Sequence, residues 1–184
     1  MRTALIAIGA AALLVLAGVR YIGVRHRLLE RRDAISAEWA QVDRAMQRRA
    51  DVVFGLAASL RNPSQDSRAV AGEISEARAM LAESRTPREK MGAYERLNQA
   101  ISRLVVVVGN ERRLKLGTKL SHLPDDVSNT ENEVNLARQR YNEALENYNT
   151  ALQLFPNNIV AAVSGFTRDD AYFQTGAGAG QAKM

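Results

Sequence analysis

A long uncharged apolar stretch at the N-terminus limits the possible folds of this chain more than any other feature. From Thr3 to Val19 no residue is charged, and after Arg20 the apolar residues continue to Val24. A helix needs about 20 residues to cross the roughly 30 Å hydrocarbon core of a bilayer. The stretch is long enough if the Arg20 side chain extends to the headgroups and Tyr21 lies at the interface. We therefore predict a transmembrane anchor over residues 1–24.

A cleavable signal peptide is the alternative interpretation of the same stretch. Arg2 would then form the basic n-region and Ala4–Leu16 the apolar h-region. No clean Ala-x-Ala cleavage site follows, and Leu16-Ala17-Gly18-Val19-Arg20 is a poor substitute for one. We therefore favour an uncleaved anchor.

The net charge of +5 is concentrated directly after this anchor. Residues 20–49 contain eight arginines and four acidic residues, whereas residues 50–184 contain equal numbers of basic and acidic residues. An excess of arginine beside a span is typical of a topology determinant or of contacts with lipid headgroups. The positive-inside rule then predicts a single-pass protein whose C-terminal domain lies in the cytoplasm. The membrane-proximal basic residues are Arg20, Arg25, Arg27 and Arg31.

No basic groove with interleaved aromatic residues is visible in the sequence, so we expect no nucleic-acid partner. The chain has no cysteine, which excludes disulfides, thiolate metal sites and a cysteine nucleophile. His26 and His122 are far apart in the sequence and have no metal-ligand spacing. The acidic residues Asp125, Asp126, Glu131 and Glu133 are better explained as helix-start and solvated charges than as a metal site. We expect no catalytic residues, no metal and no cofactor.

The residues after the anchor repeat apolar side chains at helical spacing. Their positions alternate in steps of three and four, as in a coiled-coil heptad, and Arg32 and Arg49 occupy two of them. Because Asn62-Pro63-Ser64 would end a helix, we predict one continuous helix from the anchor to about Arg61. The apolar members of this stripe are Leu28, Ile35, Trp39, Val42, Met46, Val53, Leu56 and Leu60.

Two helices are predicted in the middle of the chain. The first covers about residues 67–84 and has one apolar face. The second begins at Thr86-Pro87-Arg88-Glu89, where a Thr N-cap and a Glu three residues later form a capping box around a Pro at the first helical position. We interpret Val105–Val108 in this helix as a fully buried helical segment rather than as a strand.

A last long helix is predicted from about Pro124 to the breaker Pro156-Asn157-Asn158. Tyr141, Tyr148 and Phe155 are spaced by seven residues, which favours core packing over an aromatic ligand site. Several asparagines on this helix are unusual, because Asn is a poor helix former, and we expect some of them to bond across the bundle or between subunits. The predicted fold class is all-α: an N-terminal transmembrane helix that continues into an antiparallel bundle over residues 25–175, followed by a flexible tail at 176–184.

The last helix resembles the LemA family. The resemblance is carried by residues 126–145, Tyr148-Asn149 and Phe155–Ala161, and it is supported by Trp39-Ala40-Gln41-Val42-Asp43 and Arg48–Val53 in the first helix. Glu76-Ala77-Arg78, Gly165-Phe166 and Tyr172-Phe173 also match. Two family elements are altered: Ala58–Pro63 replaces a Gly-Tyr-x-x-His-Glu element, and Asn110–Lys115 departs from a Tyr-Pro-x-Leu-Lys turn.

The resemblance implies a membrane segment, a long helical bundle and no established enzymatic activity. One relative, the magnetosome protein MamQ, is tied to forming an intracellular membrane compartment, and others occur beside membrane proteases. We therefore predict a self-associating structural protein, not an enzyme, that organises or remodels the bacterial inner membrane. The alternative is an adaptor for a membrane protease or an envelope-stress system. The expected partners are the lipid bilayer, further copies of the chain and, for the adaptor, another membrane protein.

Self-association is predicted through the first helix. An Arg within an apolar stripe is costly unless it is paired, and the short second helix leaves about Leu28–Val42 without an evident intramolecular partner. The same helix of another copy would cover it, with the candidate contact residues Arg32, Ile35, Trp39 and Arg49. The alternative is that the last helix covers this stripe within the chain.

Overall fold

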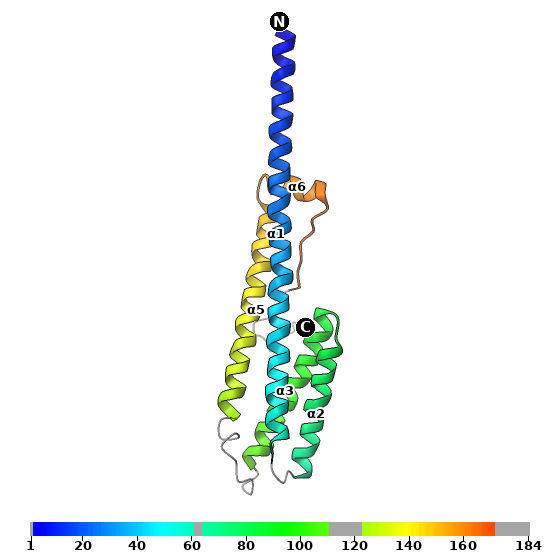
Figure 1. Ribbon diagram of the computed structural model, residues 1–184, viewed down its shortest axis with the longest axis vertical. Helices are drawn as coiled ribbons and strands as arrows, with labels where there is room; N and C mark the ends of the chain where they lie inside the picture. The colour runs from blue at the N-terminus through cyan, green and yellow to red at the C-terminus, as the bar shows by residue number, and fades with distance from the viewer. Residues whose placement is uncertain (1, 61–63, 111–122, 172–184) are drawn as a thin grey trace, which may run out of the picture. The chain divides into compact units, whose positions relative to one another are not determined.

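The structure is a computed structural model in which residues 2–60, 64–110 and 123–171 are described. Their secondary structure is helical, and no strand occurs in these ranges, which confirms the all-α fold class (Figure 1). The helices are α1 (Arg2–Ala58), α2 (Gln65–Glu83), α3 (Pro87–Asn110), α5 (Leu123–Gln153) and α6 (Asn157–Ser164). The predicted tail at 176–184 lies outside the described residues.

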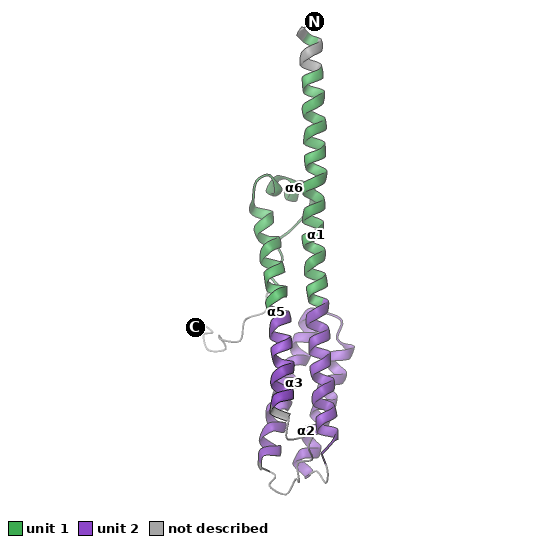
Figure 2. Ribbon diagram, turned by 60° about the vertical axis from the view of Figure 1, so that its left-hand side comes forward, with its two compact units in different colours: residues 1–39, 139–184 green, residues 40–138 purple. Residues whose placement is uncertain are grey.

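The chain divides into two compact units, coloured separately in Figure 2. Unit 1 contains residues 1–39 and 139–184, and unit 2 contains residues 40–138. Unit 1 is therefore built from the N-terminal part of α1, the C-terminal part of α5 and α6. Unit 2 is built from the C-terminal part of α1, from α2 and α3, and from the N-terminal part of α5.

Unit 2 is a helical bundle in which α2 and α3 form a helical hairpin (Figure 1). Both helices begin at residues that satisfy backbone donors. The Ser64 hydroxyl accepts from the Ser67 amide at 3.1 Å, and the predicted capping box is present at α3. There the Glu89 amide donates to Thr86 Oγ1 and the Thr86 amide donates to Glu89 Oε2, both at 3.2 Å.

The core of unit 2 follows the predicted stripes. Buried apolar residues come from all of its helical segments, including Val42, Met46 and Val53 of α1, Ile74 and Leu81 of α2, Leu97 and Leu104 of α3 and Val134 of α5. The valine run of α3 is the exception. Val108 is buried, but Val105 and Val106 are exposed, so the prediction of a fully buried segment was wrong. At helical spacing, four consecutive residues point around the whole helix and cannot all face one core.

Unit 1 has a smaller core at the point where α6 packs on α1. It consists of Val24, Leu28, Ala151, Val160 and Ala161, with Leu152 and Phe166 packed against it. The last helix ends at Gln153, and the breaker residues start the additional helix α6, which the sequence analysis did not predict.

The turn between α5 and α6 explains this second helix. Asn157 Nδ2 donates to the Ala151 carbonyl at 3.1 Å and so satisfies an acceptor at the end of α5. Pro156, which follows a cis peptide bond, is the N-cap of α6. Gly165 ends α6 with a φ of 73°, a left-handed conformation that a residue with a Cβ rarely adopts.

Phe155 lies in this turn and is 80% exposed, so its predicted core position was also wrong. The stripe of seven-residue spacing holds for Tyr141 and Tyr148, which are buried. It does not extend to Phe155, because α5 has ended two residues earlier and the side chain no longer follows the helical period.

The first part of α1 is long and apolar enough to cross a bilayer, and it is the one such helix in the described residues. Only 6% of its most apolar window is buried within the structure, so it is not a core helix of the bundle. Its exposed large apolar side chains are Ile8, Leu13, Leu14, Val15, Leu16 and Val19, each more than 60% exposed.

Candidate membrane-proximal site

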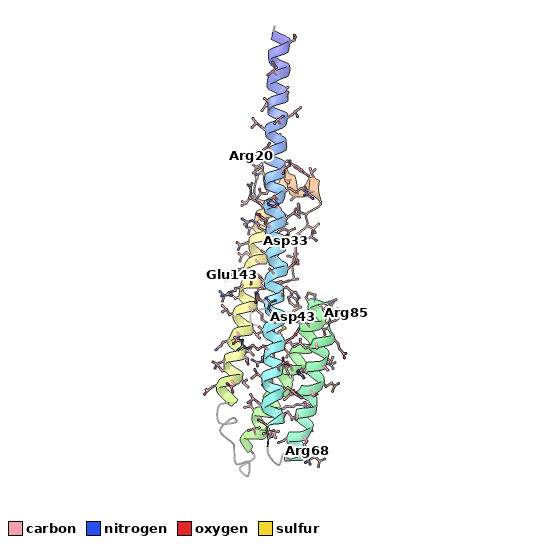
Figure 3. All side chains as sticks on the ribbon, in the orientation of Figure 1. Arg20, Asp33, Asp43, Arg68, Arg85 and Glu143 are labelled. Atoms are coloured by element: carbon pink, nitrogen blue, oxygen red, sulfur yellow. The ribbon has the colours of Figure 1, made fainter. Side chains whose placement is uncertain are left out.

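The four predicted membrane-proximal arginines follow the apolar part of α1 and are all exposed. Arg20 is labelled in Figure 3. Arg25 and Arg27 lie one to two turns further along the same helix. Arg31 Nη1 donates to the Asn147 carbonyl of α5 at 3.0 Å, so this residue also connects two helices of unit 1. These side chains carry the excess positive charge on the segment where headgroup phosphates would be met.

Tyr21 connects α1 to α6. Its hydroxyl lies 2.9 Å from Ser164 Oγ, and Val24, three residues later, belongs to the core that holds Val160 and Ala161. The end of the apolar stretch of α1 and the whole of α6 therefore lie at the same level of unit 1 (Figure 1).

Arg32 and Ile35 line a cavity of about 400 Å³ in unit 1. Ile35 is buried, whereas Arg32 is exposed at the edge of the cavity. Arg32 thus occupies a position of the apolar stripe without being part of the core. At this level α1 packs against α5 and an irregular segment rather than against a full ring of helices, which leaves room for the guanidinium to reach solvent. The remaining lining comes from Ser36, Tyr148 and residues 165–170.

Residues 165–170 are held against α5 by two side chains. The Tyr148 hydroxyl donates to the Thr167 carbonyl at 3.0 Å. Asn149 Nδ2 donates to the Asp169 carbonyl at 2.6 Å, and the Asp169 amide donates to Asn149 Oδ1 at 3.0 Å. Asn149 is buried, and its side-chain amide makes both of these hydrogen bonds with the backbone of Asp169, as the backbone of a neighbouring β-strand would. This asparagine of α5 therefore bonds to the segment that follows α6 and not to another helix.

The two tyrosines of this region titrate well above neutral pH. Burial raises the pKa of Tyr148, the nearby Arg32 charge lowers it and Asp169 raises it. Burial, with a further contribution from Asp169, raises the pKa of Tyr141 to about 12. Both phenols are therefore neutral hydrogen-bonding groups, and neither is suited to act as a base.

Trp39 packs within unit 1. Its ring meets Tyr141 edge-on, with centroids 5.6 Å apart and an interplanar angle of 64°. Leu28, Ile35 and Val42 on the same stripe are buried. The premise that this stretch lacks an intramolecular partner was wrong, and the alternative, coverage from within the chain, describes the structure.

Arg49 belongs to unit 2 and is an internal residue, only 4% exposed. It forms an ion pair with Glu131 and donates from Nη1 to the Val127 carbonyl at 3.2 Å. Its guanidinium lies 5.9 Å from the ring centroid of Tyr94, whose hydroxyl donates to Glu131 at 3.4 Å. Burial is the main cause that raises the pKa of Tyr94 to about 12. Arg49 therefore belongs to a different compact unit from Arg32, Ile35 and Trp39.

Sequence reasoning did not identify a second buried cation, Lys90. Its ammonium nitrogen lies 2.6 Å from Asp43 Oδ1, and it also donates to the Leu81 carbonyl at 3.4 Å (Asp43 is labelled in Figure 3). The signal was present in the sequence. Lys90 falls on the apolar stripe that continues through Tyr94 and Leu97, as Arg49 falls on the stripe of α1.

The acidic patch at the start of α5 provides ion pairs. Glu131 pairs with Arg49, and Glu133 Oε2 lies 3.5 Å from Arg48 Nη1. In the part of the chain that the structure describes, no group of three or more His, Cys, Asp or Glu side chains could hold a metal ion.

Comparison with known families supports the resemblance seen in the sequence. The model of the LemA family matches residues 38–183, which is most of the chain. The chain belongs to the LemA family. No curated protein matches it significantly.

The family match bears on some of the site residues and not on others. Within this LemA-family chain, Trp39, Arg49 and Asn149 lie inside the matched region. Arg20 to Ile35 precede it, so the apolar stretch, the basic segment and the edge of the cavity are interpreted from their own chemistry alone. Tyr172-Phe173 lies outside the described residues.

Proposed function

We propose that this LemA-family protein is a membrane-anchored structural protein that organises or remodels the bacterial inner membrane without catalysing a reaction. The observation that carries the proposal is the exposed apolar stretch of α1. Its six large side chains, each more than 60% exposed, form a continuous apolar surface of the kind that soluble monomers rarely present to water. The 22 residues from Thr3 to Val24 extend about 33 Å as a helix, which matches the hydrocarbon core.

The transition from span to bundle occurs inside one helix. α1 continues without a break from the exposed Val19 to the buried Val24 and Leu28. A span joined to the rest of unit 1 by a helix, rather than by a loop, holds the core of that unit at a fixed height on the bilayer. This rigid connection is what a scaffold that shapes or orders a membrane requires.

The anchoring is tested by fractionation of the full-length protein. It should stay with membranes after a carbonate wash and keep its N-terminal residues. Replacing both Leu13 and Leu14 with Arg should release it, because a charged side chain at the centre of a span costs about 2.5–3.5 kcal/mol on insertion scales. Leu136→Arg is the matched control, because Leu136 is an exposed leucine of α5. A mature N-terminus near Gly18 would instead show that the stretch is a cleaved signal peptide.

The proposed orientation places the bundle in the cytoplasm. Five arginines follow the span within a short distance, at positions 20, 25, 27, 31 and 32, against Arg2 before it. A reporter that is active only in the cytoplasm should work when it is fused after Met184. Digestion of the bundle by a protease added outside intact spheroplasts would reverse the orientation.

An adaptor for another membrane protein is the second candidate function. Val105 and Val106, on the exposed side of α3, favour it, because two adjacent β-branched apolar residues gain from being covered. Size in mild detergent separates the two functions. A homogeneous homo-oligomer supports the scaffold, whereas a monomer supports the adaptor.

A further inference from the structure

The segment from Leu154 to Phe166 is unusual in its composition. None of its residues is charged, although charged residues make up 24% of the chain. Val160 and Ala161 face inward and are buried, so α6 has one apolar face in the core of unit 1. Most of its other face and of the preceding turn is apolar as well, and Asn158 is the exposed polar residue there. The exposed side chains there are Leu154 (57%), Phe155 (80%), Ile159 (55%) and Val163 (74%), which we call the α6 outer face.

A short helix that has large apolar side chains on two sides is expected to be covered on both. One side of α6 is covered by α1 and α5. The α6 outer face, with four large apolar side chains in one helix and the turn before it, has no such cover within the described residues.

The position of α6 within unit 1 indicates what could cover this face. Ser164 bonds to Tyr21, and Val160 and Ala161 pack with Val24, so α6 contacts the last apolar residues of the stretch of α1. Ile22, on the same part of α1, is 68% exposed. Both ribbon views show α6 running across the direction of α1 rather than along it (Figures 1 and 2). If α1 crosses the bilayer, α6 therefore lies in the plane of its interface.

We propose that the α6 outer face inserts into the interfacial region of the bilayer beside the span, with lipid as its occupant. The inference rests on the proposed anchoring through α1. A bilayer around residues 3–24 already reaches the level of Tyr21 and Val24, so lipid contacts this face without recruitment of any partner. Because the segment carries no charge, its insertion is driven by burial of apolar area and does not require anionic lipid.

This contact would give the bundle a second attachment to the membrane. A single helix leaves a protein able to rotate about the helix axis and to tilt. An interfacial helix packed on the same unit fixes the side of unit 1 that faces the lipid. Arg20, Arg25 and Arg27, at the same level, would meet the headgroups around it.

The test uses the absence of cysteine from the full-length chain. Single cysteines replace Val163, Phe155, Leu14 or Glu143, and each protein is labelled with an environment-sensitive fluorophore. The proteins are reconstituted into phosphatidylcholine vesicles that contain lipids with a nitroxide quencher in the upper acyl chain. Leu14 reports on the span. Glu143, an exposed residue on α5 of the same unit, reports on the aqueous phase (Figure 3).

We expect the labels at positions 163 and 155 to be quenched several-fold more strongly than the label at 143. Ile159→Asp, added to the Val163→Cys protein, should reduce quenching at 163 several-fold, because a carboxylate in the middle of the face opposes insertion. The same change should leave quenching at position 14 unaltered. All substituted side chains of α6 and its turn are exposed, so the packed core keeps its residues.

The outcomes separate this inference from the anchoring on which it rests. An unquenched label at position 14 would refute the anchor and thereby the proposed function. A quenched label at 14, with 163 and 155 behaving like 143, would leave the anchor intact and overturn the inference. Disulfide-linked dimers of the unlabelled Val163→Cys protein, together with no lipid quenching of the labelled protein, would assign the face to a second copy and also overturn the inference. Quenching only when phosphatidylglycerol is added would overturn apolar insertion in favour of attraction by the arginines.

Discussion

At the residue scale, the two arginines within the apolar stripe of α1 have different environments. Their spacing alone predicts the same environment for both, because Arg32 and Arg49 each fall where a heptad places an apolar residue. Arg49 is buried and paired with Glu131, as the cost of an unpaired buried charge requires. Arg32 is exposed, because its neighbours in unit 1 leave a cavity. The periodicity of a sequence predicts which residues share one face of a helix, but it does not predict how many other elements pack on that face.

The buried ion pair of Arg49 can be compared with the exposed ion pair of Arg48 by the free energy of unfolding that each contributes. Arg49→Ala should lower the free energy of unfolding by about 1–3 kcal/mol, because Glu131 and the Val127 carbonyl lose a buried donor. Arg48→Ala is the matched control. Its pair with Glu133 is exposed on both sides and should contribute no more than about 1 kcal/mol. Thermal unfolding in mild detergent, followed by circular dichroism, measures both. Equal losses would mean that burial of Arg49 does not decide its contribution.

Phe155 allows a second comparison, between an exposed apolar residue after α5 and a buried apolar residue within α5. Phe155→Ala should change the free energy of unfolding by less than about 1 kcal/mol, as is usual for exposed positions. Leu145→Ala, at a fully buried position of α5, should cost about 2–5 kcal/mol. The same unfolding measurement checks both. A large loss for Phe155→Ala in detergent would place this ring in a core that the structure does not contain.

At the scale of elements, a helix end was predicted correctly where its residues can play only one role, either starting or ending a helix. Thr86-Pro87-Arg88-Glu89 gave the start of α3, and its hydrogen bonds are the expected ones. Pro156-Asn157-Asn158 has two meanings, because the same residues can end one helix and begin the next. Here they do both, and α6 was missed. The signal that could have revealed it is the uncharged apolar continuation from Ile159 to Val163.

The capping box of α3 makes a prediction about pH. The backbone amides of Arg85 and Thr86, followed by the Thr86 hydroxyl, lower the pKa of Glu89 below its ordinary value of 4.5. A carboxyl group whose pKa is lower in the folded state contributes stability above the unfolded pKa and loses it as the pH falls through the folded value. Glu89→Gln should therefore lower the melting temperature near neutral pH. The difference from the wild type should vanish in acid well below 4.5.

Replacing Thr86, the other residue of the capping box, tests the start of α3 without changing a charge. Thr86→Ala should cost about 0.5–2 kcal/mol, the usual range for losing an N-cap hydroxyl. Thr150→Ala removes the same group from an exposed position inside α5, where Ala is the better helix former, and should be neutral or slightly stabilising. If both substitutions have the same effect, the capping hydrogen bond does not support the start of α3.

At the scale of the whole molecule, the sequence predicted the fold class, the apolar stretch and the family. It could not predict which faces remain uncovered. The stripe from Leu28 to Val42 is predicted to need a second copy, because α2 is too short to cover it. The length of α5 and the return of the chain through α6 cover this stripe in the structure. Whether a face is covered depends on contacts between residues about 120 positions apart, such as Arg31 with Asn147, which no local pattern encodes.

We therefore predict self-association through the span rather than through the bundle. Gly9, Ala10, Ala11 and Ala12 are small residues in the apolar stretch, and small residues let helices approach closely in a bilayer. Trp39, by contrast, is half-buried against Tyr141. Copies that associate should do so through a narrow face of the span.

The prediction is a pattern of crosslinks in native membranes. Single cysteines at positions 9, 10, 11 and 12 of this cysteine-free chain sample every side of the helix, since successive residues are rotated by about 100°. One or two of the four should give a disulfide-linked dimer, and the others should not. Trp39→Cys should give none, because its position is covered by α5 within the chain. Dimers through position 39 would restore the bundle interface. Absence of dimers at all five positions would argue against self-association and favour the adaptor, whereas equal yields at the four span positions would indicate random collision in the bilayer.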